Sequence, residues 1–216
     1  MFWFRLYIDT CFYVKLKHPF VYSILKSEGL RFFKEIEPKL KQNYFLCAVV
    51  NRVAGMAKKI EKTNAARLLD KAGIAYELIP YEFDENDLAA RHVAESLGQD
   101  IASVFKTLVL HGDRTGHVVC VVPGDGEVNL KSLAKVSGNK KVEMIAMKDL
   151  LGVTGYIRGG CSPVGMKKKF PTYFHSTAQD FDFIYVSAGV RGLQLKVAPS
   201  DLIGFVDGVV ADVASF

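Results

Sequence analysis

The segment 156–165, Tyr-Ile-Arg-Gly-Gly-Cys-Ser-Pro-Val-Gly, holds the residues of this chain that are best suited to chemistry. Gly159 and Gly160 have no Cβ, so the backbone there can approach a ligand closely. Their N–H groups can then point at a negative charge that develops on the ligand. Cys161 and Ser162 follow directly and each carries an atom that can act as a nucleophile.

Neither Cys161 nor Ser162 lies in the pattern that a protein nucleophile requires. Pro163 removes the backbone N–H that would serve as an oxyanion donor after a serine nucleophile, and the last Gly of that motif is absent. Activation of Cys161 would need a base, but no motif connects it to any of the candidate histidines. These candidates are His92, His111, His117 and His175. We therefore expect Cys161 to line a small pocket, with a role as nucleophile as the less favoured alternative.

Lysines outside this segment are the remaining candidates. Lys106 follows Phe105 at the start of a strongly apolar run, so its ammonium lies either in solvent beyond a sheet or in a cleft with an anion. Lys167, Lys168 and Lys169 follow the glycine-rich segment directly. Such a run is either a solvated face or a contact for the backbone of a nucleic acid. Taken alone, each pattern favours the solvated alternative.

The composition indicates one globular domain with an appendage. The chain has 216 residues, half of them hydrophobic, which is enough to bury a sizeable core. Its four cysteines include no C-x-x-C pair and its histidines are scattered, so we predict no metal site and no cofactor. Few and unpatterned cysteines are typical of the reducing cytoplasm.

Residues 1–55 differ from the rest of the chain. They contain nine Lys and Arg against four Asp and Glu, and 12 of the 25 aromatic residues, whereas the remainder carries 19 basic and 19 acidic residues. No apolar run approaches the ~20 residues of a membrane helix, and no signal-peptide pattern is present. We interpret residues 1–55 as an atypical extension, with Met56 as the true start and 56–216 as the functional domain. An accessory tail and a membrane-surface anchor are the alternatives.

Short helices and strands are expected after Met56, without a regular βαβ rhythm. Helices are predicted at 64–72 (capped by Thr63), from a cap at Asp84 or Asn86 to Leu97, and at 130–136 (capped by Asn129), 148–151 and 201–210. Strands are predicted at 74–81, 105–110, 117–122, 142–145, 172–175, 183–187 and 193–197, the second and third forming a hairpin. The pattern favours an α+β fold with a single mixed, largely antiparallel sheet and flanking helices.

Four segments together resemble the YbaK/EbsC family of freestanding aminoacyl-tRNA deacylases. They are 105–108 (Phe-Lys-Thr-Leu), 140–144, 154–165 and 184–192, and the resemblance covers essentially all of the chain after Met56. This family is related to the editing insertion of bacterial prolyl-tRNA synthetases. The resemblance implies that the chain removes cysteine from Cys-tRNA(Pro), and from Cys-tRNA(Cys) as a further substrate, with prolyl-tRNA synthetase as a partner. An alanyl-tRNA(Pro) deacylase and a non-catalytic tRNA- or synthetase-binding module are the alternatives.

The resemblance also assigns roles to individual residues. Lys106 would hold the aminoacyl-adenosine end at the reacting centre, while Gly159 and Gly160 would steady the oxyanion. Substrate contacts are implied at Tyr81, Thr107, Cys161, Ser162, Pro163, Ser187, Gly189 and Arg191. The substrate thiol would attack its own carbonyl and form a cyclic thiolactone, so no protein nucleophile is needed. Gln194 stands where some members carry an acidic residue, which puts any role of that carboxylate toward the substrate amine in doubt.

Overall fold

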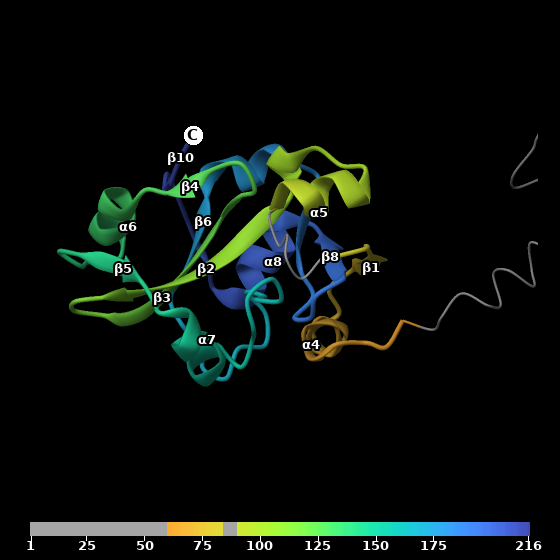
Figure 1. Cartoon of the computed structure of the whole chain (residues 1–216), viewed down its shortest axis with the longest axis horizontal. Helices are drawn as coiled ribbons and strands as arrows, with labels where there is room; N and C mark the ends of the chain where they lie inside the picture. The colour runs from red at the N-terminus through yellow and green to blue at the C-terminus, as the bar shows by residue number, and fades with distance from the viewer. Residues whose placement is uncertain (1–59, 84–89) are drawn as a thin grey trace, which may run out of the picture. The chain divides into compact units, whose positions relative to one another are not determined.

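The computed structural model describes residues 60–83 and 90–216. The extension 1–55, the start at Met56 and the caps at Asp84 or Asn86 lie outside these residues. The helices within them are α4 (Asn64–Ala72), α5 (Ala90–Leu97), α6 (Leu130–Val136), α7 (Met147–Thr154) and α8 (Pro199–Val206), with short 3-10 helices at Ile101–Ser103 and Ser176–Asp180 (Figure 1). In this part of the chain, no helix has the length and apolar character needed to cross a membrane.

Within the described residues, the strands form three sheets. A five-stranded sheet has the order β5 (Val142–Met144), β2 (Phe105–Gly112), β3 (Gly116–Pro123), β6 (Thr172–His175) and β9 (Val209–Ala211). A three-stranded antiparallel sheet has the order β1 (Tyr76–Pro80), β8 (Leu193–Val197) and β7 (Ile184–Ser187), and β4 (Glu127–Val128) pairs with β10 (Ala214–Ser215). The first three strands of the large sheet are antiparallel, whereas β6 pairs in parallel with both β3 and β9.

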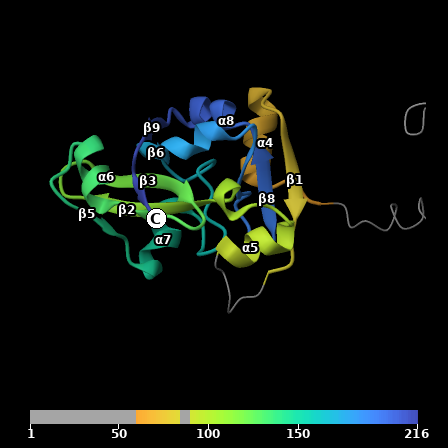
Figure 2. The same cartoon turned by 90° about the horizontal axis from the view of Figure 1, so that it is seen from above.

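The predicted α+β class with mixed, largely antiparallel pairing is confirmed, with one difference in the sheet. The strands are divided among three sheets, because β7 and β2 do not form a continuous ladder. A single parallel bridge between Val104 and Tyr185 joins the two larger sheets at this point. Figure 2 shows the large sheet and the β1–β8 pair at opposite ends of the domain.

Both faces of the central hairpin are covered by hydrophobic clusters. Val119 and Val121 belong to the largest cluster, which also contains residues from α4, α8 and the three-stranded sheet. Val118 and Val122 project to the other face, into a cluster with Leu133 of α6. Because successive side chains of a strand alternate between faces, β3 is buried on both sides and reads as a continuous apolar run.

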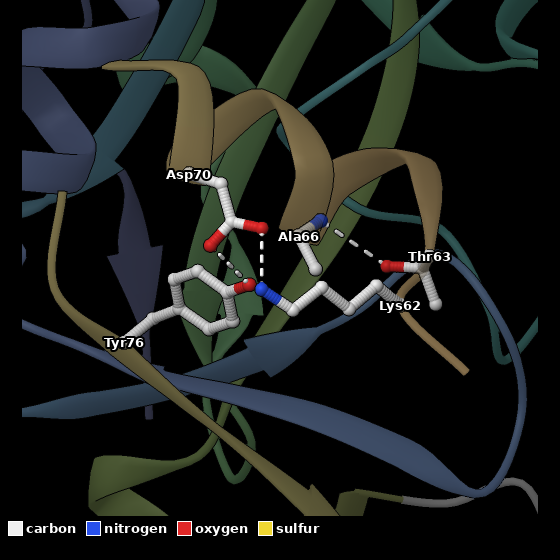
Figure 3. Close-up of polar contacts among 5 residues, drawn as sticks. All are labelled: Lys62, Thr63, Ala66, Asp70 and Tyr76. Carbon is white, nitrogen blue, oxygen red and sulfur yellow. Dashed lines mark hydrogen bonds and ion pairs between the residues drawn. The ribbon is translucent and has the colours of Figure 1, made fainter. Parts of the chain in front are cut away.

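Helix α4 begins as predicted and holds β1 in place (Figure 3). The Thr63 hydroxyl accepts a hydrogen bond from the Ala66 N–H at 3.2 Å, and Gly73 ends the helix in the left-handed conformation. Asp70 accepts a bond from the Tyr76 hydroxyl at 2.9 Å and one from the Lys62 ammonium at 2.6 Å. These contacts join the helix to the first residue of β1, which leads to Tyr81.

The C-terminal prediction was partly wrong. Instead of one helix over 201–210, α8 ends at Val206 and the chain continues as strand β9. Asp207 takes a positive φ of 51° at the helix end. Gly208 then passes the Phe174 ring so closely that a Cβ there would lie 2.7 Å from it. The pairing of β9 with β6 therefore overrides the local helical pattern.

Candidate functional site

Lys106 lies near the start of β2, where this strand runs beside β7. Its side chain is half-buried, and its ammonium donates a hydrogen bond to the Gly124 carbonyl at 3.1 Å. Burial lowers the pKa of Lys106, while the negative charges of Glu127 and Asp125 act in the opposite direction. The strand and the 124–126 loop thus hold a cationic group close to the junction of the two sheets.

Two glycine-rich loops, 157–165 and 187–192, meet beside this junction. A Cβ on Gly160 would lie 3.3 Å from backbone atoms of Val190, so only glycine fits without displacing the other loop. The Arg191 guanidinium donates to the Arg158 carbonyl at 3.0 Å. The structure therefore brings the segments 154–165 and 184–192 into contact.

The amide of Gly160 is engaged within its own loop. Gly159 has a φ of 79°, and the Gly160 N–H donates to the Ile157 carbonyl at 3.0 Å, which closes a tight turn. Gly160 therefore contributes close approach between the loops, while its N–H takes part in this turn. The oxyanion role that the resemblance implied for Gly159 and Gly160 stays a prediction.

Tyr156 contacts both loops, and the sequence patterns did not identify it as a residue of the site. Its hydroxyl donates to the Val164 carbonyl at 2.6 Å, and burial raises its pKa to about 12. A Cβ on Gly165 would lie 3.0 Å from this hydroxyl, and a Cβ on Gly189 would lie 2.9 Å from the ring. No pattern in the sequence predicts that one tyrosine packs against two glycines so far apart along the chain.

Tyr81, Ser187 and Gln194 lie at one end of the three-stranded sheet. The Tyr81 N–H donates to the Gly192 carbonyl at 3.0 Å, and the Ser187 hydroxyl accepts from the Gly189 N–H at 3.2 Å. Gln194 lies opposite Ser187 in the β7–β8 ladder, so both side chains project from the same face. Gln194 is only 5% exposed, and within the described residues its Oε1 has no hydrogen-bond partner. Its burial was not predicted.

Cys161, Ser162 and Pro163 are the buried residues of the 157–165 loop, together with Gly160 and Val164. Burial raises the pKa of the Cys161 thiol to about 12, so it is almost entirely protonated at neutral pH. Ser162 is fully buried, and its hydroxyl accepts a hydrogen bond from the Val164 N–H at 3.3 Å. Both side chains therefore shape the loop, and neither is prepared for nucleophilic attack.

We predict that replacing Cys161 by alanine leaves deacylation within about threefold of the unchanged protein, because a thiol in this protonation state is not an activated nucleophile. Single-turnover deacylation at pH 7.5 would measure this effect. A deacylation rate lower by a hundredfold or more, in a variant with unchanged thermal stability, would contradict the prediction and make Cys161 a candidate nucleophile again.

Thr107 does not share a face with Lys106, because neighbouring side chains of a strand alternate. It lies on the face of Phe105 and Val109, which belong to the cluster that contains Cys161. Thr107 is 9% exposed, and its hydroxyl has no hydrogen-bond partner among the described residues. The substrate contact that the resemblance implied for Thr107 therefore lies on the opposite face of β2 from the Lys106 ammonium.

The lysine run does not form one basic surface. The Lys167 ammonium donates to the carbonyls of Leu151 and Gly152 at 3.1 and 3.4 Å, at the C-terminal end of α7. Lys169 pairs with Asp207. Lys168 is exposed and close enough to His117 to help lower the pKa of that imidazole, after the larger effects of burial and of His111. In residues 60–83 and 90–216, no group of three or more His, Cys, Asp or Glu side chains is placed to hold a metal ion.

Comparisons with known proteins agree with this architecture. Residues 85–205 match the family model described as an aminoacyl-tRNA editing domain. The chain is 50% identical over 162 residues to EbsC of Enterococcus faecalis, a protein named as a candidate Cys-tRNA(Pro)/Cys-tRNA(Cys) deacylase, and the match covers 74% of this chain and 99% of EbsC. A proline–tRNA ligase of Thermosipho africanus is 34% identical over 86 residues, which are 40% of this chain and 15% of the ligase.

Solved structures show the same fold at low sequence identity. A candidate trans-editing enzyme for prolyl-tRNA synthetase superposes with a TM-score of 0.63 at 19% identity, covering 72% of this chain and 100% of that structure. A hypothetical protein superposes with a TM-score of 0.64 at 23% identity, covering 69% of this chain and 97% of that structure. The resemblance to the YbaK/EbsC family is thus confirmed by sequence and by fold. With more than half of its length matched by the editing-domain model, the chain belongs to the aminoacyl-tRNA editing domain family.

Proposed function

We propose that this protein is a trans-editing deacylase that removes cysteine from mischarged Cys-tRNA(Pro), and also from Cys-tRNA(Cys). The relatives support the reaction class, because one is named for both substrates and another for editing in support of prolyl-tRNA synthetase. Editing is needed because a synthetase pocket gains only about 1–3 kcal/mol from a difference of one methylene, too little to reject a similarly small amino acid.

One observation carries the mechanism: β2 offers the Lys106 cation and the glycine-rich loops offer close backbone approach, but the two candidate nucleophiles of the 157–165 loop are buried and not activated. Cys161 has a raised pKa, and the Ser162 hydroxyl is engaged with a backbone N–H. A site of this kind favours a reaction whose nucleophile comes from the substrate. The thiol of a cysteinyl ester is such a nucleophile, and it reaches its own carbonyl within one molecule.

In the proposed reaction the substrate sulfur bonds to the ester carbonyl carbon and its proton is released. The tetrahedral intermediate then breaks its bond to the ribose oxygen of the terminal adenosine, which takes up a proton. The products are a cyclic cysteine thiolactone and tRNA with a free hydroxyl. The Lys106 ammonium would hold the aminoacyl-adenosine end at the reacting centre and stabilise negative charge that develops there.

Ser187 and Gln194 are proposed to receive the amino acid. The Gln194 Oε1 is a buried acceptor without a partner among the described residues, and an N–H of the substrate ammonium would satisfy it. A neutral amide supplies this hydrogen bond without the attraction of a carboxylate. Gly189, Arg191 and Tyr81 belong to the same group of loops, and we propose them as further walls of the pocket.

Binding of the tRNA is proposed to depend only weakly on this chain. Residues 56–216 have equal numbers of basic and acidic side chains, and two of the three ammonium groups at 167–169 are engaged within the chain. We therefore retain Lys168 as the proposed tRNA contact of this run. Prolyl-tRNA synthetase is the proposed partner that supplies further affinity, and the cytoplasm is the proposed location.

Deacylation of Cys-tRNA(Pro), Ala-tRNA(Pro) and Pro-tRNA(Pro) tests this function directly. We expect rapid loss of cysteine and slow loss of alanine and proline, because only cysteine carries a thiol that can cyclise. We expect the same result from a chain that begins at Met56, as the domain assignment proposes. Preferential loss of alanine would identify the alternative deacylase, and no turnover of any ester would favour a binding module.

A further inference from the structure

His175 is a buried histidine that the proposed mechanism does not use. It is the last residue of β6, it is 3% exposed, and its Nδ1 accepts hydrogen bonds from the backbone N–H groups of Val213 and Ala214, each at 3.2 Å. An imidazole nitrogen can accept hydrogen bonds only when it carries no proton. Asp212 also approaches this nitrogen, at 3.5 Å, from a largely exposed position. His175 therefore holds the backbone at Val213 and Ala214, where the last four residues of the chain begin.

These last residues cover the segment that follows the β3 strand. Ala214 and Ser215 pair with Val128 and Glu127 as strands β10 and β4, and the Asn129 N–H donates to the Val213 carbonyl at 2.8 Å. Figure 1 shows β10 beside β4, close to the marked C-terminus. The Phe216 ring lies against Gly126, where an added Cβ would be 3.2 Å from it. The C-terminus thus contacts both the 124–126 loop and the strand after it.

The same loop holds the ammonium of Lys106. The Gly124 carbonyl accepts its hydrogen bond at 3.1 Å, and Asp125 and Glu127 favour its charged form. Gly124 itself is closely approached on the other side of the loop, because an added Cβ would lie 2.9 Å from the Ala90 Cβ and 3.0 Å from the Val104 carbonyl oxygen. Only the C-terminal side of the loop, at Gly126 and Glu127, is held by residues from the end of the chain.

We propose that His175 and residues 213–216 form a C-terminal clamp that fixes the 124–126 loop, and that His175 is thereby a positioning residue for Lys106. The proposal rests on the role proposed above for Lys106. It deepens that role by naming the side chain that keeps the loop carbonyl and the two carboxylates around the ammonium. His175 acts only through the clamp and does not touch the substrate.

Two substitutions at His175 test the clamp. In His175→Leu the acceptor is lost, and we expect kcat for Cys-tRNA(Pro) to fall by about ten- to a hundredfold while KM changes little, since small displacements of a catalytic group have effects of this size. In His175→Asn the Oδ1 stands the same number of bonds from Cα as Nδ1 and can accept two hydrogen bonds. We expect this variant to recover most of the lost kcat.

A matched control separates positioning from general loss of stability. Asn139 is also buried, and its Oδ1 also accepts from two backbone N–H groups, those of Arg114 at 2.9 Å and Thr115 at 3.0 Å. It lies at the other end of the β2–β3 hairpin from Lys106. Asn139→Ala should therefore reduce thermal stability while leaving kcat unchanged. An equal fall of kcat in this variant would overturn the proposal.

Two measurements test the clamp without deacylation: amide hydrogen exchange and an NMR titration of Lys106. In His175→Leu, hydrogen exchange at the amides of Val213 and Ala214 should accelerate. Water should then reach Lys106, and the pKa read from the NMR titration of its Cε should rise toward that of an exposed lysine. Deletion of the exposed residues 215–216 should shift this titration in the same direction and serves as a second variant if His175→Leu does not fold.

These readouts distinguish failure of the clamp from failure of the proposed function. If the unchanged protein deacylates no ester but the Lys106 titration shifts as expected, the clamp stands and the proposed function falls. If the amides of Val213 and Ala214 exchange faster while both the Lys106 titration and kcat stay unchanged, the clamp has no influence on Lys106 and the proposal is overturned.

Discussion

Replacing Lys106 by methionine is expected to lower kcat for Cys-tRNA(Pro) by about a hundredfold or more, with the fold intact. Loss of one group that stabilises transition-state charge has an effect of this size in other enzymes. Methionine keeps an unbranched stem in the half-buried position of Lys106, so the packing changes little. Single-turnover deacylation, with thermal unfolding measured in parallel, gives the two quantities required.

The matched control is Lys135→Met, which removes an exposed ammonium from the last turn of α6. It should leave turnover unchanged, because this lysine is remote from the loops at the junction of the sheets. Full activity of Lys106→Met would show that the reaction needs no cation at this position. The reading of the site as charge stabilisation around a substrate nucleophile would then be wrong.

The pH dependence of the unchanged protein follows from the same group. Burial lowers the pKa of Lys106, so its charged form is lost at a lower pH than that of an exposed lysine. Since the ammonium is the proposed active form, kcat should fall as pH rises through this lowered pKa. Rates corrected for spontaneous ester hydrolysis should show this limb in the unchanged protein and lack it in Lys106→Met.

Replacing Gly189 by alanine is expected to have the second large effect, on stability and turnover together. Gly189 has a φ of 95°, and an added Cβ would lie 2.9 Å from the Tyr156 ring. A side chain in this backbone region costs about 1–2 kcal/mol, and overpacking against a buried ring adds about 1–3 kcal/mol. Because Tyr156 holds both loops, relief of the clash must move the Gly160 loop or the Ser187 loop, and deacylation should fall at least tenfold.

Gly73→Ala isolates the backbone part of this effect. Gly73 has a φ of 71° at the end of α4, but nothing lies within 4 Å of an added Cβ. This variant should lose only about 1–2 kcal/mol of unfolding free energy and keep full activity. If Gly73→Ala and Gly189→Ala lose the same stability and both remain active, then Tyr156 does not couple the two loops.

Local chemistry made a large part of this structure predictable. Thr63 and Asn129 cap their helices as expected, and the 105–110 and 117–122 runs form the predicted hairpin. Each of these features depends on residues that are close together along the chain. The glycine-rich segments were recognisable for a related reason, since loops that take a positive φ or approach another backbone need glycine at defined positions.

Other features depend on residues that are far apart along the chain, and local patterns do not predict them. Strand β9 forms because β6 offers a partner, although its residues read as helix. Lys167 and Lys169 read as a basic surface, but they meet the end of α7 and Asp207. The ammonium of Lys106 meets a carbonyl 18 residues away, and the Tyr156 ring meets Gly189.

Local sequence patterns and the tertiary structure therefore determine different parts of the function. Residue types and their local order indicated a family, a reaction and the segments that carry it. The protonation of Cys161, the engagement of the Gly160 amide and the burial of Gln194 followed only from folding. Burial and hydrogen bonding are set by everything that surrounds an atom in space, and most of those neighbours are distant in the sequence.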